Sequence, residues 1–66
     1  MFAIGDKVII NMPLQAGHIE HAKQKRTFNH RITTICGICG DRYTLYIDGE
    51  KYRWEESILG RIIKPN

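Results

Sequence analysis

Residues 40–56 read GDRYTLYIDGEKYRWEE, and this stretch decides the fold. Apolar and polar side chains alternate from Tyr43 to Asp48, and after an Asp-Gly pair the apolar set continues at Tyr52 and Trp54. A period of two on both sides of a turn signal is typical of a β-hairpin. The stretch therefore predicts two paired strands, with Tyr43 opposite Trp54 on the buried face.

The tip of this hairpin can be closed in two ways. A two-residue Asp-Gly turn and a four-residue loop over Asp48–Lys51 keep the same side chains on each face. The two-residue turn places Glu50 on the buried face, where a carboxylate is costly, so we favour the four-residue loop. With either loop we expect Tyr46 and Arg53 to share the outer face.

The rest of the chain predicts three more strands and one helical turn. The strands are expected over residues 2–10, 31–39 and 60–64, and the turn over residues 55–59. Val8 and Ile10 should point inward from the first strand, which Pro13 helps to end because proline lacks a backbone donor. Gly37 should mark a bulge or a sharp bend in the second strand.

Residues 11–30 are expected to form a long basic loop between the first two strands. The window from His18 to Arg31 holds four basic side chains against Glu20 alone, whereas the rest of the chain carries six of each sign. A negatively charged partner would be drawn to this segment first. A loop of this length in a small domain is usually either functional or disordered, and Glu20–Arg26 allows one helical turn.

The order of these elements resembles a known architecture. Five short strands, one long early loop and a helical turn before the last strand resemble the Src-homology-3-like (SH3-like) barrels of small bacterial and phage-type proteins, the broad group that includes KOW and Tudor modules. The matching segments are residues 4–8, 34–38, 40–45 and 52–59. The resemblance implies an all-β, five-stranded barrel with a short 3-10 turn before the last strand, forming a single domain over residues 1–66.

Two cysteines and two histidines have the spacing of zinc ligands. Cys36 and Cys39 are separated by two residues, as are His18 and His21, and together they would complete a tetrahedral site. On a regular strand, however, positions three apart face opposite sides, and the apolar pattern continues through Ile38 as in an ordinary strand. We therefore expect no cofactor and keep a zinc-stabilised Cys2His2 knuckle as an alternative.

Neither catalysis nor a membrane span is expected. A cysteine–histidine pair needs a third orienting group and an oxyanion site, and 66 residues leave little room for a pocket that excludes water. No segment approaches the roughly 18 apolar residues of a span. Met1–Asp6 lacks the basic start and apolar run of a signal peptide, so a cytoplasmic location with reduced or metal-bound thiols is expected.

These observations favour a non-catalytic module that docks a protein partner through the long loop and the outer face of the hairpin. The short closing strand leaves a sheet edge open to another copy, which predicts a monomer or a weak homodimer. A phage or mobile-element accessory protein that inhibits host machinery would fit this plan. The side chains expected to contact the partner are Lys23, Lys25, Arg26, Phe28, Arg31 and Tyr46.

Nucleic-acid binding by the same loop is the alternative function. Its basic side chains would follow a phosphate backbone, and Phe28 would stack on a base. Such binding would weaken steeply with added salt.

Overall fold

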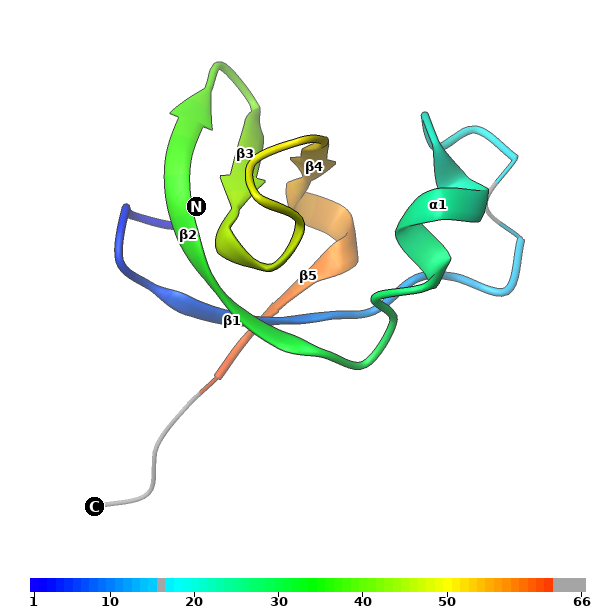
Figure 1. Ribbon diagram of the computed structural model, residues 1–66, viewed down its shortest axis with the longest axis horizontal. Helices are drawn as coiled ribbons and strands as arrows, with labels where there is room; N and C mark the ends of the chain where they lie inside the picture. The colour runs from blue at the N-terminus through cyan, green and yellow to red at the C-terminus, as the bar shows by residue number, and fades with distance from the viewer. Residues whose placement is uncertain (16, 63–66) are drawn as a thin grey trace.

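The computed structural model describes residues 1–15 and 17–62, and within them the chain is all-β (Figure 1). Its five strands form one antiparallel sheet with the order β4-β3-β2-β1-β5. The strands are β1 (Lys7–Ile10), β2 (Ile32–Cys39), β3 (Arg42–Leu45), β4 (Arg53–Glu55) and β5 (Leu59–Arg61). One α-helix, α1 (Ala22–Arg26), and two 3-10 helices, η1 (Tyr46–Asp48) and η2 (Glu56–Ile58), complete the fold. The predicted all-β class and the predicted helical turn before the last strand are confirmed.

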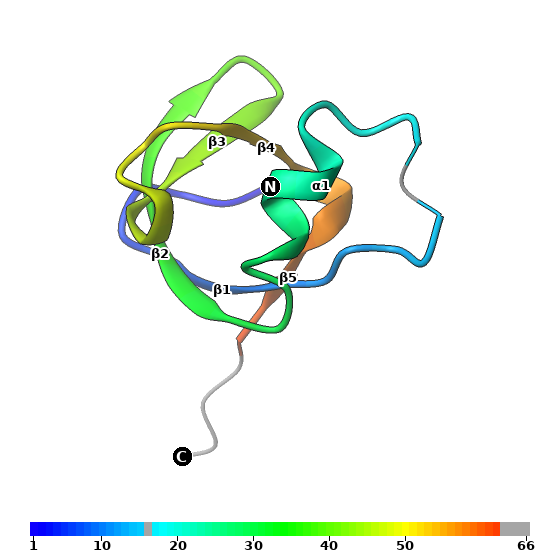
Figure 2. The same cartoon turned by 45° about the vertical axis from the view of Figure 1, so that its right-hand side comes forward.

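The central strand β2 belongs to both halves of the sheet. Its first part pairs with β1, with Thr33 opposite Val8, and its second part pairs with β3, with Ile38 opposite Tyr43. The register shifts between Ile35 and Gly37, so the predicted irregularity at Gly37 is confirmed. An added residue on one strand bends it, and Figures 1 and 2 show β2 as one long curved strand. The bend turns the two halves of the sheet toward each other.

The β3–β4 hairpin has the predicted register but a different tip. Tyr43 lies opposite Trp54, as the alternation predicts. The last hairpin pair is Thr44 opposite Arg53, and η1 follows β3, so neither the two-residue turn nor the four-residue loop is correct. The cause is Asp48, whose carboxylate accepts hydrogen bonds from the backbone N–H groups of residues 50 and 52 (3.1 and 3.0 Å) and from Nε1 of Trp54 (3.1 Å). Tyr46 consequently lies in η1 and not on the strand face beside Arg53.

The core fills the inside of the bent sheet. Val8 and Ile10 are fully buried, as predicted, and Trp54 and Leu45 are equally buried. Ile38 is 49% exposed, which contradicts the apolar pattern expected through it. It lies opposite the buried Tyr43, but at the next-to-last position of β2 the core no longer covers it. Among residues 1–15 and 17–62, the buried apolar side chains are Phe2, Val8, Ile10, Met12, Ile19, Ile35, Tyr43, Leu45, Trp54, Ile58 and Leu59.

Two predicted strands are shorter than expected. β1 begins at Lys7 because residues 3–6 form a turn, in which the Asp6 N–H donates to the Ala3 carbonyl at 3.0 Å and Gly5 has a φ of 95°. β5 begins at Leu59, one residue before the expected start. Residues 63–66, which include the end of the predicted closing strand, lie outside the described residues.

We call residues 11–30 the strap. Its neck is closed by backbone hydrogen bonds from Ile10 N–H to the Arg31 carbonyl (3.0 Å) and from His30 N–H to the Ile10 carbonyl (2.8 Å). Ile19 from its middle is 5% exposed and belongs to the core. The strap is therefore packed on the sheet, which corrects the expectation of a free basic loop. Figure 2 shows it leaving the end of β1, carrying α1, and returning to the start of β2.

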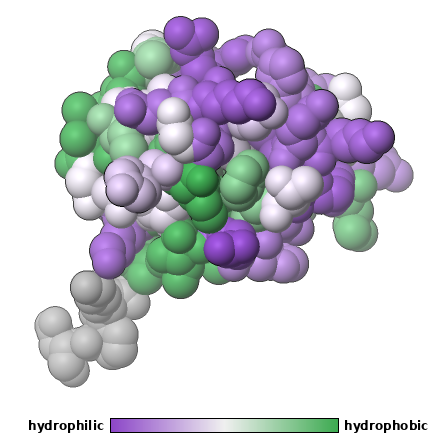
Figure 3. Space-filling view, viewed as in Figure 1, coloured by the Kyte–Doolittle hydropathy of each residue, from purple (hydrophilic) through white to green (hydrophobic). Residues whose placement is uncertain are grey.

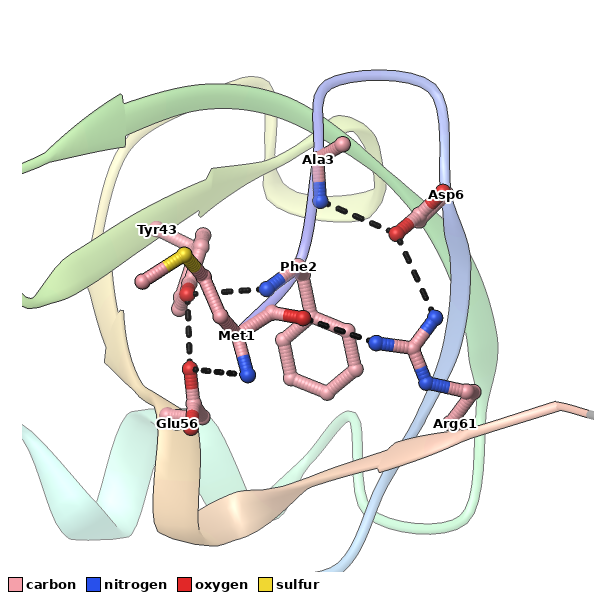
Figure 4. A network of polar contacts seen from close by, with 7 residues as sticks. All are labelled: Met1, Phe2, Ala3, Asp6, Tyr43, Glu56 and Arg61. Atoms are coloured by element: carbon pink, nitrogen blue, oxygen red, sulfur yellow. Dashed lines mark hydrogen bonds and ion pairs between the residues drawn. The ribbon is translucent and has the colours of Figure 1, made fainter.

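The chain start is held by a network of polar contacts (Figure 4). The Tyr43 hydroxyl donates to Glu56 (2.7 Å) and accepts from the Phe2 N–H (3.1 Å). The Met1 amino group lies 3.1 Å from the same Glu56 carboxylate. Arg61 donates to the Met1 carbonyl (2.7 Å), and its guanidinium lies 5.1 Å from the centre of the Phe2 ring. These contacts tie residues 1–2 to β3, η2 and β5.

Candidate binding groove between the strap and the hairpin

A hollow of about 210 Å³ lies between the strap and the outer side of the β3–β4 hairpin. Most of its walls are charged or polar, and they consist of Glu20, His21, Arg42, Thr44, Glu50, Lys51, Tyr52 and Arg53. A second hollow of about 260 Å³ is lined by Gln24, Thr27, Phe28, Asp48, Lys51 and Tyr52. Because Lys51 and Tyr52 line both hollows, we treat them as one site and call it the strap groove.

Lys25 fixes the strap wall of this groove. Its side chain is 1% exposed, its ammonium donates to the Arg53 carbonyl, and the same ammonium lies 5.3 Å from the centre of the Trp54 ring. Burial penalises the charged form and lowers the pKa of Lys25, and the carboxylates of Glu55 and Glu20 only partly offset this effect. Because Lys25 was expected to contact a partner, its burial is a difference from the expected surface position: the side chain holds α1 against β4 and exposes almost no surface.

Three further contacts hold the strap beside the hairpin. An oxygen of Glu20 lies 3.1 Å from the guanidinium of Arg42. The rings of His21 and Tyr52 are 5.1 Å apart at an angle of 42°. Phe28 meets Trp54 edge-on at 6.3 Å. The strap is thus attached to the hairpin near Glu20 and His21 and again at Phe28, as well as at Lys25.

Positive charge in the polar hollow is only partly neutralised within the chain. Glu20 lies close to both Arg42 and His21, at 3.1 and 3.4 Å. Among the described residues, no carboxylate lies within ion-pair distance of Lys51 or Arg53. The Lys51 ammonium instead lies 5.4 Å from the centre of the Tyr52 ring. The groove therefore presents two cations that an external anion can reach.

The other predicted contact residues are spread around the strap. Lys23 and Arg31 are exposed, on α1 and just before β2. Arg26 is exposed, but its guanidinium donates to the Pro13 carbonyl at 2.9 Å. Phe28 is half-buried and lines the groove.

Tyr46 is 76% exposed in η1 and is not part of the groove lining. The groove residues missed by the contact prediction include Arg42, Lys51, Tyr52 and Arg53. The hairpin pattern assigns Arg42 to the outer face but does not show that the strap lies against that face. Tyr52 was assigned to the buried set, whereas it is half-buried and also forms the ridge of the groove.

The four possible zinc ligands are not assembled into a site. Within residues 1–15 and 17–62, no group of three His, Cys, Asp or Glu side chains is placed to hold a metal ion. Cys39 is exposed opposite Arg42, Cys36 is half-buried, and His21 lies against Tyr52. Burial raises the pKa of the Cys36 thiol, so its thiolate form is disfavoured.

A third hollow, of about 420 Å³, lies at the chain start and is lined in part by Met1, Phe2, Ile38 and Tyr43. Glu56 at its rim is already engaged by the Met1 amino group and the Tyr43 hydroxyl. This hollow offers apolar surface without free cations and is a weaker candidate than the strap groove. Figure 3 shows hydrophilic side chains over the hairpin and α1, and hydrophobic surface lower down over β1 and β2.

Comparison with known proteins gives no match, since no family model, curated protein or solved structure corresponds to the chain. In the described part of the chain, no helix is long and apolar enough to cross a membrane.

Proposed function

We propose that the chain is an SH3-like barrel that acts as a non-catalytic binding module. The strand order β4-β3-β2-β1-β5, the sharing of β2 between two half-sheets and the placement of η2 between β4 and β5 support the barrel assignment. The module docks a protein partner through the strap groove. Small barrels of this kind recognise partners through loops and grooves on a rigid sheet.

One observation carries this proposal: the groove has walls from two segments far apart in sequence, and one wall holds cations without an internal partner. The strap supplies Glu20 and His21, and the hairpin supplies Lys51 and Arg53. A rigid sheet that positions exposed charged and aromatic side chains is the usual plan of a recognition surface.

A protein partner fits the groove better than a nucleic acid does. Phe28, the ring expected to stack on a base, packs edge-on against Trp54. Carboxylates of Glu20, Glu50 and Asp48 also line the groove and would repel the successive charges of a phosphate backbone. A protein surface can match such mixed charge residue by residue.

The test compares three versions of the chain as bait in a host extract: wild type, a Lys51→Glu/Arg53→Glu double variant, and a Lys7→Glu control on β1. Proteins recovered by wild type and control but lost by the double variant, and then shown to bind as purified components, support the proposal. Recovery of the same proteins by all three versions contradicts it. Titration with labelled DNA and RNA at two salt concentrations checks the alternative, because tight salt-sensitive binding would favour nucleic acid.

A further inference from the structure

We infer that the segment recognised by the strap groove is a peptide that carries a carboxylate side chain close to an apolar one, laid across Tyr52. This inference rests on the proposed docking function and names the chemistry of the partner. It follows from the different character of the two hollows that meet at Tyr52.

The first hollow is suited to a carboxylate. Arg42, Lys51 and Arg53 contribute three cationic groups to its lining, against the carboxylates of Glu20 and Glu50. Glu20 is engaged by Arg42, which leaves Lys51 and Arg53 as the cations available to an incoming group. Hydrogen bonds between a guanidinium and a carboxylate are stronger than neutral ones and have a defined geometry.

The second hollow is suited to an apolar side chain. Two of its polar side chains are already engaged inside the chain: the Thr27 hydroxyl donates to the Gln24 carbonyl (2.7 Å), and Asp48 accepts from Tyr52 N–H and Trp54 Nε1. What remains toward the hollow is largely the apolar surface of Phe28 and Tyr52. An apolar side chain placed there would lose water without breaking the hydrogen bonds of Thr27 or Asp48.

The two hollows are adjacent because Tyr52 and Lys51 line both. In an extended peptide, side chains two positions apart lie on the same side and are separated by about 6 to 7 Å. A segment lying across the Tyr52 ring can therefore place one side chain in each hollow. The Lys51 ammonium above the Tyr52 ring lies where the hollow for the carboxylate meets the hollow for the apolar side chain.

The experiment selects binders from a library of random short peptides displayed on phage, with the folded full chain as the target. The Lys51→Gln/Arg53→Gln double variant and a Lys7→Gln control are used as parallel targets. We expect the peptides enriched on wild type and control to share an Asp or Glu within two positions of a large apolar residue. The double variant should not enrich them.

One enriched peptide is then made in three forms: as selected, with its acid changed to the amide, and with its apolar residue changed to serine. Loss of the charge-assisted contact should weaken binding to the wild type by about tenfold. The acid-to-amide change should have a smaller effect on binding to the Arg53→Gln variant, because the peptide carboxylate and the Arg53 guanidinium are expected to contact each other. Equal effects on both proteins would show that the acid does not meet Arg53.

The outcomes separate the inference from the proposed function. Enriched peptides that lack an excess of acidic residues, yet bind through the groove, overturn the inference and leave docking intact. Absence of any enriched peptide dependent on the groove contradicts both. Binding of the selected acidic peptide that is unchanged in the double variant also overturns the inference.

Discussion

Lys25 shows how a side chain assigned to the surface by its charge can become a structural element. The side chain is 1% exposed, and its ammonium meets both the Trp54 ring and the Arg53 carbonyl. A buried charge of this kind loses hydration, so its net contribution comes largely from the packing of its stem and from satisfying a carbonyl on an edge strand.

Replacing Lys25 separates the contribution of its stem to stability from that of its ammonium. Lys25→Ala should lower the free energy of unfolding by about 2 to 3 kcal/mol, since it leaves a cavity and an unpaired carbonyl. Lys25→Met also leaves the carbonyl unpaired, but it keeps most of the stem and no longer buries a charge, so it should cost less than about 1 kcal/mol. Urea unfolding followed by the fluorescence of Trp54, the only tryptophan, measures both. The exposed neighbour change Lys23→Ala should stay within about 0.5 kcal/mol. Equal losses in the Ala and Met variants would show that the ammonium, and not the stem, carries the stability.

Glu56 couples the chain start to the sheet through its ionised carboxylate. The hydrogen bond from the Tyr43 hydroxyl, followed by the contact with the Met1 amino group, holds the pKa of Glu56 below its ordinary value of 4.5. A carboxyl group with a lower pKa in the folded state stabilises the fold above its unfolded pKa. This contribution is lost as the pH falls through its folded pKa.

We therefore expect Glu56→Gln to be less stable than wild type at neutral pH, with a difference that shrinks as the pH falls below about 4.5. Urea unfolding at a series of pH values measures this difference. In a Tyr43→Phe background the effect of Glu56→Gln should be smaller, because the strongest partner of the carboxylate is gone. A gap between Glu56→Gln and wild type that stays constant with pH would contradict the assignment.

At the scale of elements, β2 depends on one residue without a side chain. A Cβ atom at Gly37 would lie 2.7 Å from Oγ1 of Thr44 on the neighbouring strand. The bend at this position lets β2 serve both half-sheets. A larger residue would push the two strands apart where the sheet turns.

Gly37→Ala should therefore destabilise the fold by about 1 to 3 kcal/mol, as overpacking of a filled site does. Much of this loss should disappear when the comparison is made in a Thr44→Ala background, where the clash is removed. Gly17, which has open space around its Cβ position, provides the control: Gly17→Ala should stay within about 0.5 kcal/mol. Chemical denaturation of the four variants and the wild type measures these values. A full loss in the Thr44→Ala background would exclude the clash as the cause.

The strap also covers an exposed sheet edge. β4 lies at the end of the strand order and leaves its outer backbone groups without a neighbouring strand. Lys25 donates to the Arg53 carbonyl on this edge. An edge strand that is short and covered is less prone to pair with another chain. The α1 segment thus closes this edge as well as forming one wall of the groove.

For the whole molecule, the strap and the sheet form one cooperative unit. Ile19 and Lys25 are buried, and Phe28 packs on Trp54. The 66-residue chain has little core to spare, so a segment that supplies buried side chains cannot be removed without loss.

Replacing residues 13–28 by a short Gly-Ser link tests this view. Burial of Ile19 alone is worth about 1.5 to 3 kcal/mol. The entropy regained by shortening the loop is only about 1 kcal/mol. We expect the deletion to lower the free energy of unfolding by about 3 kcal/mol or more, since Lys25 and Phe28, which pack on Trp54, are also lost. Exposure of Trp54 should shift its fluorescence to longer wavelength. Unchanged urea unfolding with unchanged emission would show that the strap is an independent appendage.

Local pattern was enough to predict the strands and the register of the hairpin. Alternation over Tyr43–Asp48, the pairing of Tyr43 with Trp54, and the irregularity at Gly37 all follow from side-chain period and glycine chemistry, which are properties of neighbouring residues. The hairpin tip escaped prediction because Asp48 bonds to groups that become its neighbours only when the loop has closed.

Period, turn residues and composition by themselves determined that this chain is an all-β fold of short strands with a basic insertion. Only the tertiary structure decided which basic side chains of that insertion and the hairpin remain available. It buried Lys25, paired Arg42 with Glu20 and left Lys51 and Arg53 facing a groove. The physical reason is that a side chain's exposure and its ion pairs depend on segments distant in sequence, whereas strand formation depends on the nearest residues.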